Sequence, residues 1–311
     1  MKEKIPMIVI VGATATGKTN LAIEIAKIKN GEIVSADSMQ IYRGLDIGTA
    51  KPSKLEMELV PHHMIDILDI SENYSVAEYV KDARKVISEI YNRHKIPILV
   101  GGTGLYINSI LDNIQYCEEG INVDLREELY KKAEKVGKEG LLKELSEFDP
   151  ESAQRLANSP QKRILRAIEI YESTGVTMTE QIKLSKSEPS PYNLNVIGLN
   201  YKDRKLLYDK INKRVEKMVQ NGLIEEAKKV WLSSDCSQTA RSAIAYKEFI
   251  PYFNGECDLQ TSIEKLKTSS RRYAKRQITW FKRDSRINWI YVDKYSSFEE
   301  VLDTSLKYMN F

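Results

Sequence analysis

The chain has 311 residues, of which 42% are hydrophobic and 29% charged, and its formal net charge is +3. These values are ordinary for a soluble globular protein, and the length allows two lobes. No apolar run approaches the roughly 20 residues that span a bilayer, which excludes a helical membrane protein. The cysteines are far apart and form no CxxC pair, which argues against a disulfide framework or a cysteine zinc site and predicts a cytoplasmic protein. Those cysteines are Cys117, Cys236 and Cys257.

An apolar run over residues 7–11 leads directly into a phosphate-binding loop of the pattern GxxxxGK[ST], and an amphipathic stretch follows it. Its glycines let consecutive backbone N–H groups point at an anion. Lys18 adds a cation, the helix start adds partial positive charge, and the Thr19 hydroxyl suits Mg²⁺. The pattern therefore predicts a bound di- or triphosphate, without predicting that a phosphate is transferred. The predicted phosphate-binding residues are Gly12, Ala13, Thr14, Ala15, Thr16, Gly17, Lys18 and Thr19.

Apolar runs alternate with amphipathic stretches through the first part of the chain, and the alternation predicts an α/β fold with a parallel sheet. The predicted strands are residues 7–11, 32–36, 64–68, 96–100, 195–199 and 288–292. The predicted helices outside the middle segment are residues 18–30, 75–95, 105–111, 204–221, 225–231, 262–283 and 298–308.

Between residues 124 and 184 only helical periodicity is seen, with breaks at Gly140, Pro150, Pro160 and Gly175. We therefore expect a phosphate-loop α/β core, resembling the P-loop NTPases, made of residues 1–116 and 195–311. A helical insertion domain would occupy residues 117–194.

Two polar side chains follow predicted strands, where ligands bind in an open α/β sheet. Asp37 comes directly after the second strand, and it could hold Mg²⁺ through water or act as a general base. A helix cap or a turn is the alternative role for this aspartate. Thr103 lies in the sequence Gly101-Gly102-Thr103-Gly104 and could hydrogen-bond a substrate or a catalytic carboxylate. A plain tight turn is the alternative there.

Basic residues gather in two places. Lys162, Arg163 and Arg166 share neighbouring faces at the start of a predicted helix, and residues 261–290 hold nine Lys or Arg against two acids. Such clusters suggest a polyanionic partner, although a solvated helix face is the alternative. Arg214 could face a diphosphate, but an isolated arginine carries little weight.

The chain resembles the bacterial tRNA dimethylallyltransferases, also called tRNA isopentenyltransferases, essentially from end to end. The second and the last of the shared motifs are long and specific. The motifs are GATATGKT (12–19), SADSMQIYRGLDIGTAKP (35–52), PHHMID (61–66), ILVGGTGLYI (98–107), KRILRAIEIY (162–171) and RRYAKRQITWFKRD (271–284).

The resemblance implies transfer of a dimethylallyl group from dimethylallyl diphosphate to N6 of the adenosine just 3′ of the anticodon. The phosphate loop would then hold the diphosphate leaving group, with Lys18, Arg214 and Mg²⁺ bound by Thr19 neutralising its charge. Asp37 would be the general base that takes a proton from the adenine amine, and Thr103 would bond near it.

The resemblance also implies tRNA contacts, with the helical insertion clamping the anticodon stem and the basic segment touching phosphates. We expect the protein to act as a monomer. Where the family commonly has Gly-Tyr-Lys, this chain has Ala245-Tyr246-Lys247, which predicts a tighter backbone approach. The implied tRNA contacts are Asp37, Ser38, Met39, Gln40, Thr103, Arg126, Gln161, Lys162, Arg163, Ile164, Leu165, Arg166, Tyr246 and Lys247.

Three other functions share part of this pattern. A small-molecule kinase would use the same loop and Asp37 but would release ADP, and it leaves the helical insertion unexplained. A prenyltransferase acting on free adenylate would modify AMP as well as tRNA. A non-catalytic RNA-binding module gives no reason for Asp37 beside an intact phosphate loop.

Overall fold

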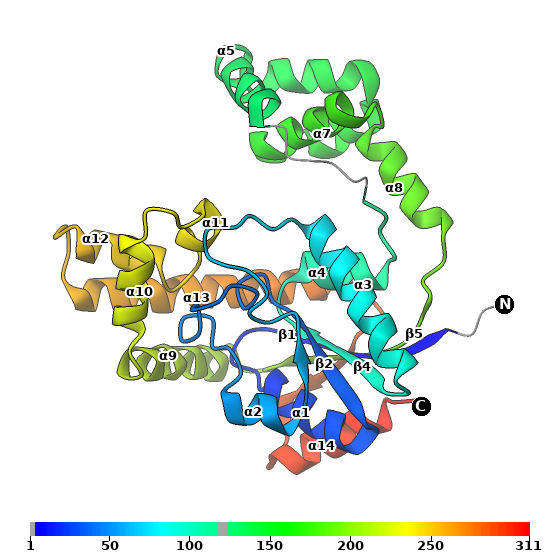
Figure 1. Ribbon diagram of the computed structural model, residues 1–311, viewed down its shortest axis with the longest axis vertical. Helices are drawn as coiled ribbons and strands as arrows, with labels where there is room; N and C mark the ends of the chain where they lie inside the picture. Colours follow the sequence, from blue (N-terminus) through cyan, green and yellow to red (C-terminus); the bar gives the residue numbers. More distant parts are fainter. Residues whose placement is uncertain (1–3, 117–122) are drawn as a thin grey trace. The chain divides into compact units, whose positions relative to one another are not determined.

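The computed structural model describes residues 4–116 and 123–311. In this part of the chain six parallel strands form one sheet in the order β3-β2-β4-β1-β5-β6, which confirms the predicted α/β fold. Figure 1 labels four of these strands, β1, β2, β4 and β5. The strands are β1 (Ile5–Gly12), β2 (Gly31–Ala36), β3 (His62–His63), β4 (Ile96–Gly101), β5 (Tyr192–Asn200) and β6 (Asn288–Tyr291).

The chain divides into two compact units. One, called here the α/β unit, comprises Met1–Asn108 and Pro191–Phe311, and the other, called the helical unit, comprises Ser109–Ser190. The helices outside the helical unit are α1 (Lys18–Lys29), α2 (Lys54–Leu59), α3 (Val76–Asn92), α4 (Gly104–Leu111, which runs across the division), α9 (Arg204–Gln220), α10 (Leu223–Leu232), α11 (Gln238–Arg241), α12 (Ile250–Phe253), α13 (Leu259–Phe281) and α14 (Phe298–Lys307). The short 3₁₀ helices are η1 (Lys247–Phe249) and η2 (Val292–Lys294).

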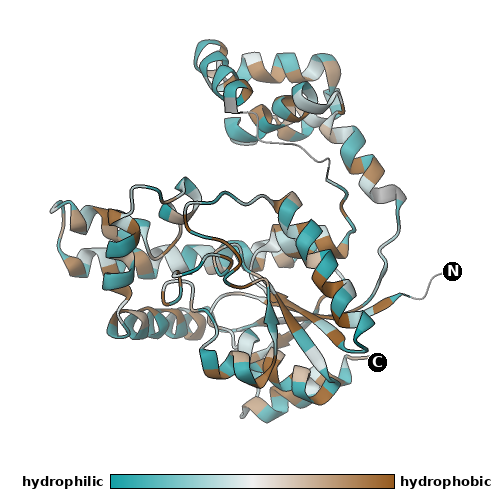
Figure 2. Ribbon diagram, in the orientation of Figure 1, coloured by the Kyte–Doolittle hydropathy of each residue, from teal (hydrophilic) through white to brown (hydrophobic). Residues whose placement is uncertain are grey.

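The sheet is buried because helices cover it. Residues 7–11 of β1 are fully buried, which is why this central strand reads as an unbroken apolar run. Helices α1 and α14 pack against each other on one face, over Ile8, Ile10 and Ile98. In Figure 2 the strands are largely brown, and the covering helices carry both brown and teal along their length. No helix in the described residues is both long and apolar enough to cross a membrane.

The third strand was predicted over residues 64–68, and this prediction is wrong. The strand β3 is only His62–His63, which pairs with Ile33 and Val34 of β2. Directly after it the backbone turns, with φ of +62° at Met64 and +55° at Asp66. The apolar pattern arises because this loop is folded back on the core, where Met64 is buried.

The helical unit contains α5 (Val123–Phe148), α6 (Pro150–Leu156), α7 (Gln161–Thr174) and α8 (Met178–Ser187). Its core packs α5 against α6 and α7 through residues such as Leu141, Leu145 and Ile168. The break expected at Gly140 lies instead at Gly137, whose φ of +65° interrupts α5. The unit starts and ends somewhat earlier in the chain than the predicted 117–194, and the predicted boundary residue Cys117 is outside the described residues.

Candidate active site

The phosphate loop joins β1 to α1 and depends on residues with positive φ. Gly12 has a φ of +144°, and a Cβ there would lie 2.3 Å from the Leu199 carbonyl oxygen of β5. Gly17, with a φ of +88°, is the N-cap of α1, so the first N–H groups of this helix lie beside the loop. Ala15 also has a left-handed φ of +64°. Positive φ values at a turn before a helix N-terminus are typical of backbone loops that bind phosphate.

Two cations and one carboxylate meet at this loop. The Lys18 ammonium donates to the Ala13 carbonyl oxygen at 2.7 Å. Burial lowers the pKa of Lys18 to about 7, the Arg214 charge acts in the same direction, and Asp37 opposes it. Burial likewise lowers the pKa of Arg214, again against Asp37. Two buried cations beside one carboxylate form a site with an excess of positive charge, which an anion would relieve.

Asp37 follows β2 and takes part in a turn while facing the cavity. Its Oδ1 accepts hydrogen bonds from the backbone N–H of Met39 at 2.9 Å and of Gln40 at 3.4 Å. The next residue, Ser38, donates its N–H to Thr103 Oγ1 at 3.1 Å. Thr103 therefore supports the turn that carries Asp37 through its contact with Ser38.

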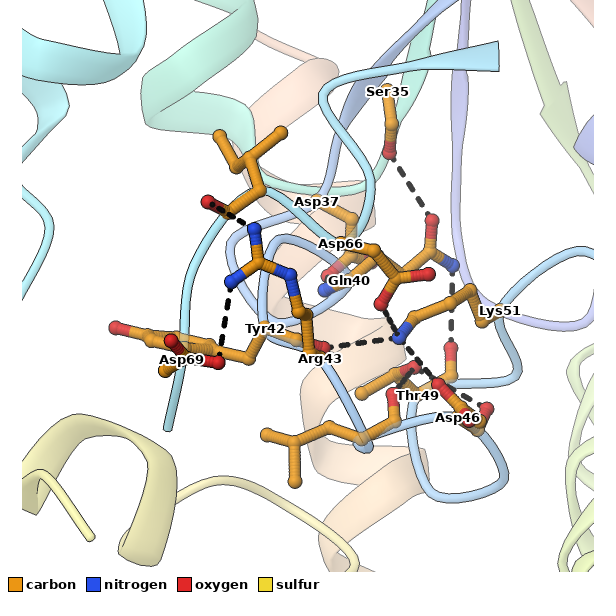
Figure 3. Close-up of polar contacts among 12 residues, drawn as sticks. Ser35, Asp37, Gln40, Tyr42, Arg43, Asp46, Thr49, Lys51, Asp66 and Asp69 are labelled. Carbon is orange, nitrogen blue, oxygen red and sulfur yellow. Dashed lines mark hydrogen bonds and ion pairs between the residues drawn. The ribbon is translucent and has the colours of Figure 1, made fainter. Parts of the chain in front are cut away.

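The turn continues into a loop, residues 41–52, held by side chains that point into it (Figure 3). The Gln40 amide accepts from the Ser35 hydroxyl at 3.1 Å and donates to the carbonyl oxygen of Thr49 at 3.3 Å. The buried Lys51 ammonium pairs with both Asp46 and Asp66. These contacts fix one wall of the cavity without a regular secondary structure.

Glu226 of α10 anchors the same loop from the other side. Its carboxylate accepts from the backbone N–H of Asp46, Ile47 and Gly48 at 2.8–3.0 Å. It also accepts from the Tyr246 hydroxyl at 2.8 Å. Tyr246 is therefore a buried support of the loop.

These parts surround a cavity of about 410 Å³ within the α/β unit. Lys18, Thr19, Asp37 and Arg214 are among the residues that line it with charged and hydroxyl groups. Apolar side chains line it as well, together with four polar residues of α13. The apolar residues include Ile33, Val100, Val215, Met218 and Leu266, and the polar α13 residues are Ser270, Tyr273, Arg276 and Gln277. The cavity thus combines two cations, a carboxylate and an apolar wall.

Comparison with known proteins gives the same assignment as the motifs. A family model described as IPP transferase matches residues 40–284. The tRNA dimethylallyltransferase of Caldanaerobacter subterraneus subsp. tengcongensis is 47% identical over 307 residues, which is 98% of each chain. The chain belongs to the tRNA dimethylallyltransferase family.

Solved structures agree with this family. A tRNA isopentenylpyrophosphate transferase from Bacillus halodurans is 42% identical, with a TM-score of 0.72 over 97% of this chain and 94% of that one. A eukaryotic dimethylallyltransferase captured acting on tRNA is 27% identical, with a TM-score of 0.80 over 97% of this chain and 77% of that one. This tRNA dimethylallyltransferase family member is thus a transferase with the fold of its relatives.

Several residues implied as tRNA contacts lie in the helical unit. Arg126 and Arg166 both pair with Glu169, and the Gln161 amide donates to the Ala133 carbonyl oxygen at 3.2 Å. Ile164 and Leu165 are buried in the core of this unit, as Tyr246 is in the α/β unit. The side chains of these three do not face solvent, which leaves the other members of the set for direct contact with an RNA. The exposed members include Lys162, Arg163 and Lys247.

Sequence reasoning did not assign Tyr273 or Gln277 to the site, although both line the cavity of this family member. Burial and the Asp37 charge raise the pKa of Tyr273, and hydrogen bonds to Thr103 and Gln277 act against them. The two residues are four apart on α13 and so share one helix face. They lie inside the basic motif, which its charges indicate as an RNA contact, and the pattern gives no separate signal for two uncharged polar residues.

Proposed function

We propose that the enzyme transfers the dimethylallyl group of dimethylallyl diphosphate to N6 of the adenosine immediately 3′ of the anticodon in tRNA. The products are N6-dimethylallyladenosine and diphosphate. The observation that carries this proposal is that the phosphate loop, Asp37 and an apolar wall meet in one cavity. The names of the relatives support the substrates.

In this reaction the donor diphosphate occupies the phosphate loop. Lys18 and Arg214 neutralise the negative charge that grows on the leaving oxygen as the C–O bond of the donor breaks. The apolar residues Val215, Met218 and Leu266 hold the five-carbon chain and keep water away from the carbon that is losing its bond.

The acceptor adenine approaches from the side of Asp37. The Asp37 carboxylate takes the N6 proton as the new N–C bond forms, because an exocyclic amine is a weak nucleophile until it starts to lose that proton. Two backbone N–H groups hold Asp37 Oδ1 in its turn. The adenine has to leave the anticodon-loop stack, which costs least for an unpaired base.

Magnesium fits this donor set. Mg²⁺ is usually held by one or two protein oxygens together with substrate phosphates and water. Thr19 and Asp37 offer such oxygens in the cavity, and the described residues contain no cluster of three or more His, Cys, Asp or Glu that would make a closed protein site. Bound there, the ion would supply further charge neutralisation at the diphosphate.

We further propose that exposed basic residues of the helical unit and of α13 contact the phosphates of the anticodon stem-loop. The exposed members of the implied set are Lys162, Arg163 and Arg166 in the helical unit and Lys247 in η1. A tRNA substrate and one self-contained cavity agree with a cytoplasmic enzyme that acts as a monomer.

The test is transfer of radiolabel from dimethylallyl diphosphate to unmodified tRNA with Mg²⁺, beside Asp37→Asn, an AMP acceptor and an ATP control. We expect label in the anticodon loop without any need for ATP, and little transfer to AMP. Asp37→Asn should bind tRNA normally and lose activity by about 100-fold or more, since general-base catalysis contributes that much. ATP turnover without label, or full activity of Asp37→Asn, would contradict the proposal.

A further inference from the structure

One buried amide connects two loops that are far apart in the sequence. Gln277 of α13 is 6% exposed. Its Oε1 accepts from the backbone N–H of Thr14 in the phosphate loop at 3.0 Å, 263 residues away along the chain. Its Nε2 donates to the Gly102 carbonyl oxygen at 3.0 Å, in the loop after β4. An amide carries a donor and an acceptor on one planar group, so it can satisfy both loops at once.

The helix approaches the second loop closely. A Cβ on Gly102 would lie 2.1 Å from Gln277 Nε2, and a Cβ on Gly104 would lie 2.3 Å from the Trp280 ring. The Trp280 ring N–H also donates to Asn108 Oδ1 at 3.2 Å. Packing this tight transmits a shift in one part to its neighbour. The loop after β4 therefore keeps its position relative to α13.

The two loops have different partners in the proposed reaction. The phosphate loop holds the donor diphosphate. The loop after β4 carries Thr103, whose Oγ1 accepts a hydrogen bond from the Ser38 N–H and so supports the turn that carries Asp37. Gln277 thus connects the phosphate loop, which binds the leaving diphosphate, with the loop after β4, which positions the general base.

We propose that Gln277 is a positioning residue that fixes the distance between the leaving diphosphate and the acceptor amine. It does so because its one side chain hydrogen-bonds the backbones of both Thr14 and Gly102. This inference rests on the proposed function, and it adds a residue that contributes through geometry and not through contact with the reacting atoms. A displacement of about 1 Å in such an arrangement lowers the rate by about 100-fold.

The first experiment compares steady-state kinetics of Gln277→Ala with Gln260→Ala, a matched truncation at an exposed site of the same helix. We expect kcat to fall by about 10- to 100-fold in Gln277→Ala, with KM for dimethylallyl diphosphate and for tRNA each changed by less than about threefold. Gln260→Ala should match the wild type. A purely structural role predicts a lower melting temperature with kcat unchanged at low temperature, and that result would overturn the proposal.

The second experiment reaches the same contact from the other loop. Gly102→Ala has no left-handed φ to prevent it, and the added Cβ meets the Gln277 amide nitrogen. Alone, Gly102→Ala should lower kcat about as much as Gln277→Ala. In the double variant the methyl group meets no amide, so Gly102→Ala should add less than about a twofold loss to Gln277→Ala. If the two substitutions instead lower kcat by independent factors that multiply in the double variant, the proposal is wrong.

These outcomes separate the two proposals. If the wild-type enzyme transfers no label, the proposed function fails. If the wild type transfers label and Gln277→Ala does so at the same kcat, only the positioning role of Gln277 fails. Should Gln277→Ala fold poorly, the single Gly102→Ala variant carries the test with Gln277 intact.

Discussion

At the scale of single residues, Lys18 is expected to make donor binding depend on pH. Its pKa of about 7, lowered by burial and by Arg214, means that the free enzyme loses this cation as the pH rises through neutrality. In the proposed reaction the diphosphate binds the charged form of Lys18, so binding above that pH requires proton uptake. We expect the affinity for dimethylallyl diphosphate to fall by up to about tenfold per pH unit between about pH 7.5 and about pH 9.

Calorimetric titration of the donor at several pH values would measure this slope. Lys18→Ala should bind more weakly at neutral pH and lose the slope, because no ammonium remains to titrate. An equal slope in Lys18→Ala would assign the pH dependence to another group.

Ala245 holds a backbone conformation that suits glycine. Its φ is +84°, and its N–H donates to Glu248 Oε2 at 3.0 Å in a buried turn. Ala245→Gly should change the free energy of unfolding by less than about 1 kcal/mol, because relief of strain offsets the added chain entropy. Ala245→Val should cost more than about 2 kcal/mol, since a β-branched residue is least tolerated there. Urea unfolding would measure both, and a stabilising Ala245→Val would contradict this account.

At the scale of elements, Glu32 joins the edge of the sheet. This buried residue of β2 pairs with His63 of β3, with Arg93 at the end of α3 and with Lys95 just before β4. Burial opposes its charge, but the bonds from His63, Lys95 and Arg93 outweigh it and lower its pKa to about 2. A depressed carboxyl pKa stabilises the fold above the ordinary value of 4.5, and this stability is lost as the pH falls toward about 2.

Since one pKa unit corresponds to about 1.4 kcal/mol, Glu32→Gln should lower the free energy of unfolding at neutral pH by up to about 3 kcal/mol. Its free energy of unfolding should also decline less steeply than that of the wild type between pH 5 and pH 2. Glu24→Gln is the control, because Glu24 makes an exposed pair with Lys27. Acid titration followed by circular dichroism would compare them. If the stabilities of Glu32→Gln and the wild type decline in parallel as the pH falls, the ion pairs of Glu32 are not the source of the pH dependence.

The elements also show what a sequence can and cannot reveal. Local signals predicted β1, its phosphate loop and α1, because an apolar run, two glycines and a helical period lie within 30 residues. The breaks before Pro150 and after Thr174 were equally local, and the structure confirms them. The strand expected at residues 64–68 failed because burial in a loop produces the same apolar pattern as a strand. The bonds of Gln277 stayed hidden because they join residues brought together only by the fold.

At the scale of the whole molecule, RNA binding is expected to draw on the helical unit. Lys162 and Arg163 are exposed at the start of α7. Each phosphate contact contributes a nearly fixed share of the salt dependence, so Lys162→Ala/Arg163→Ala should reduce the slope of log affinity against log salt by about 1.5. Donor binding should not change, because the phosphate loop lies in the other unit.

Filter binding of tRNA over a range of salt concentrations would measure that slope. The control is Lys131→Ala/Lys135→Ala, which removes the same charge from exposed positions of α5 in the same unit. A slope reduced equally by both pairs would point to net charge and not to a phosphate contact at the start of α7.

The order of the strands sets when this protein can mature on the ribosome. β1 lies between β4 and β5, and its Ile5 pairs with Tyr192, so the central strand lacks one neighbour until the chain has grown past the whole helical unit. The helical unit, a compact unit made of one continuous segment, Ser109–Ser190, can fold while it emerges. Gln277 arrives later still, and until then its amide cannot link the Thr14 backbone to the Gly102 carbonyl oxygen in the loop after β4. A nascent chain stopped before α13 would carry an intact phosphate-loop motif and still have no assembled catalytic centre.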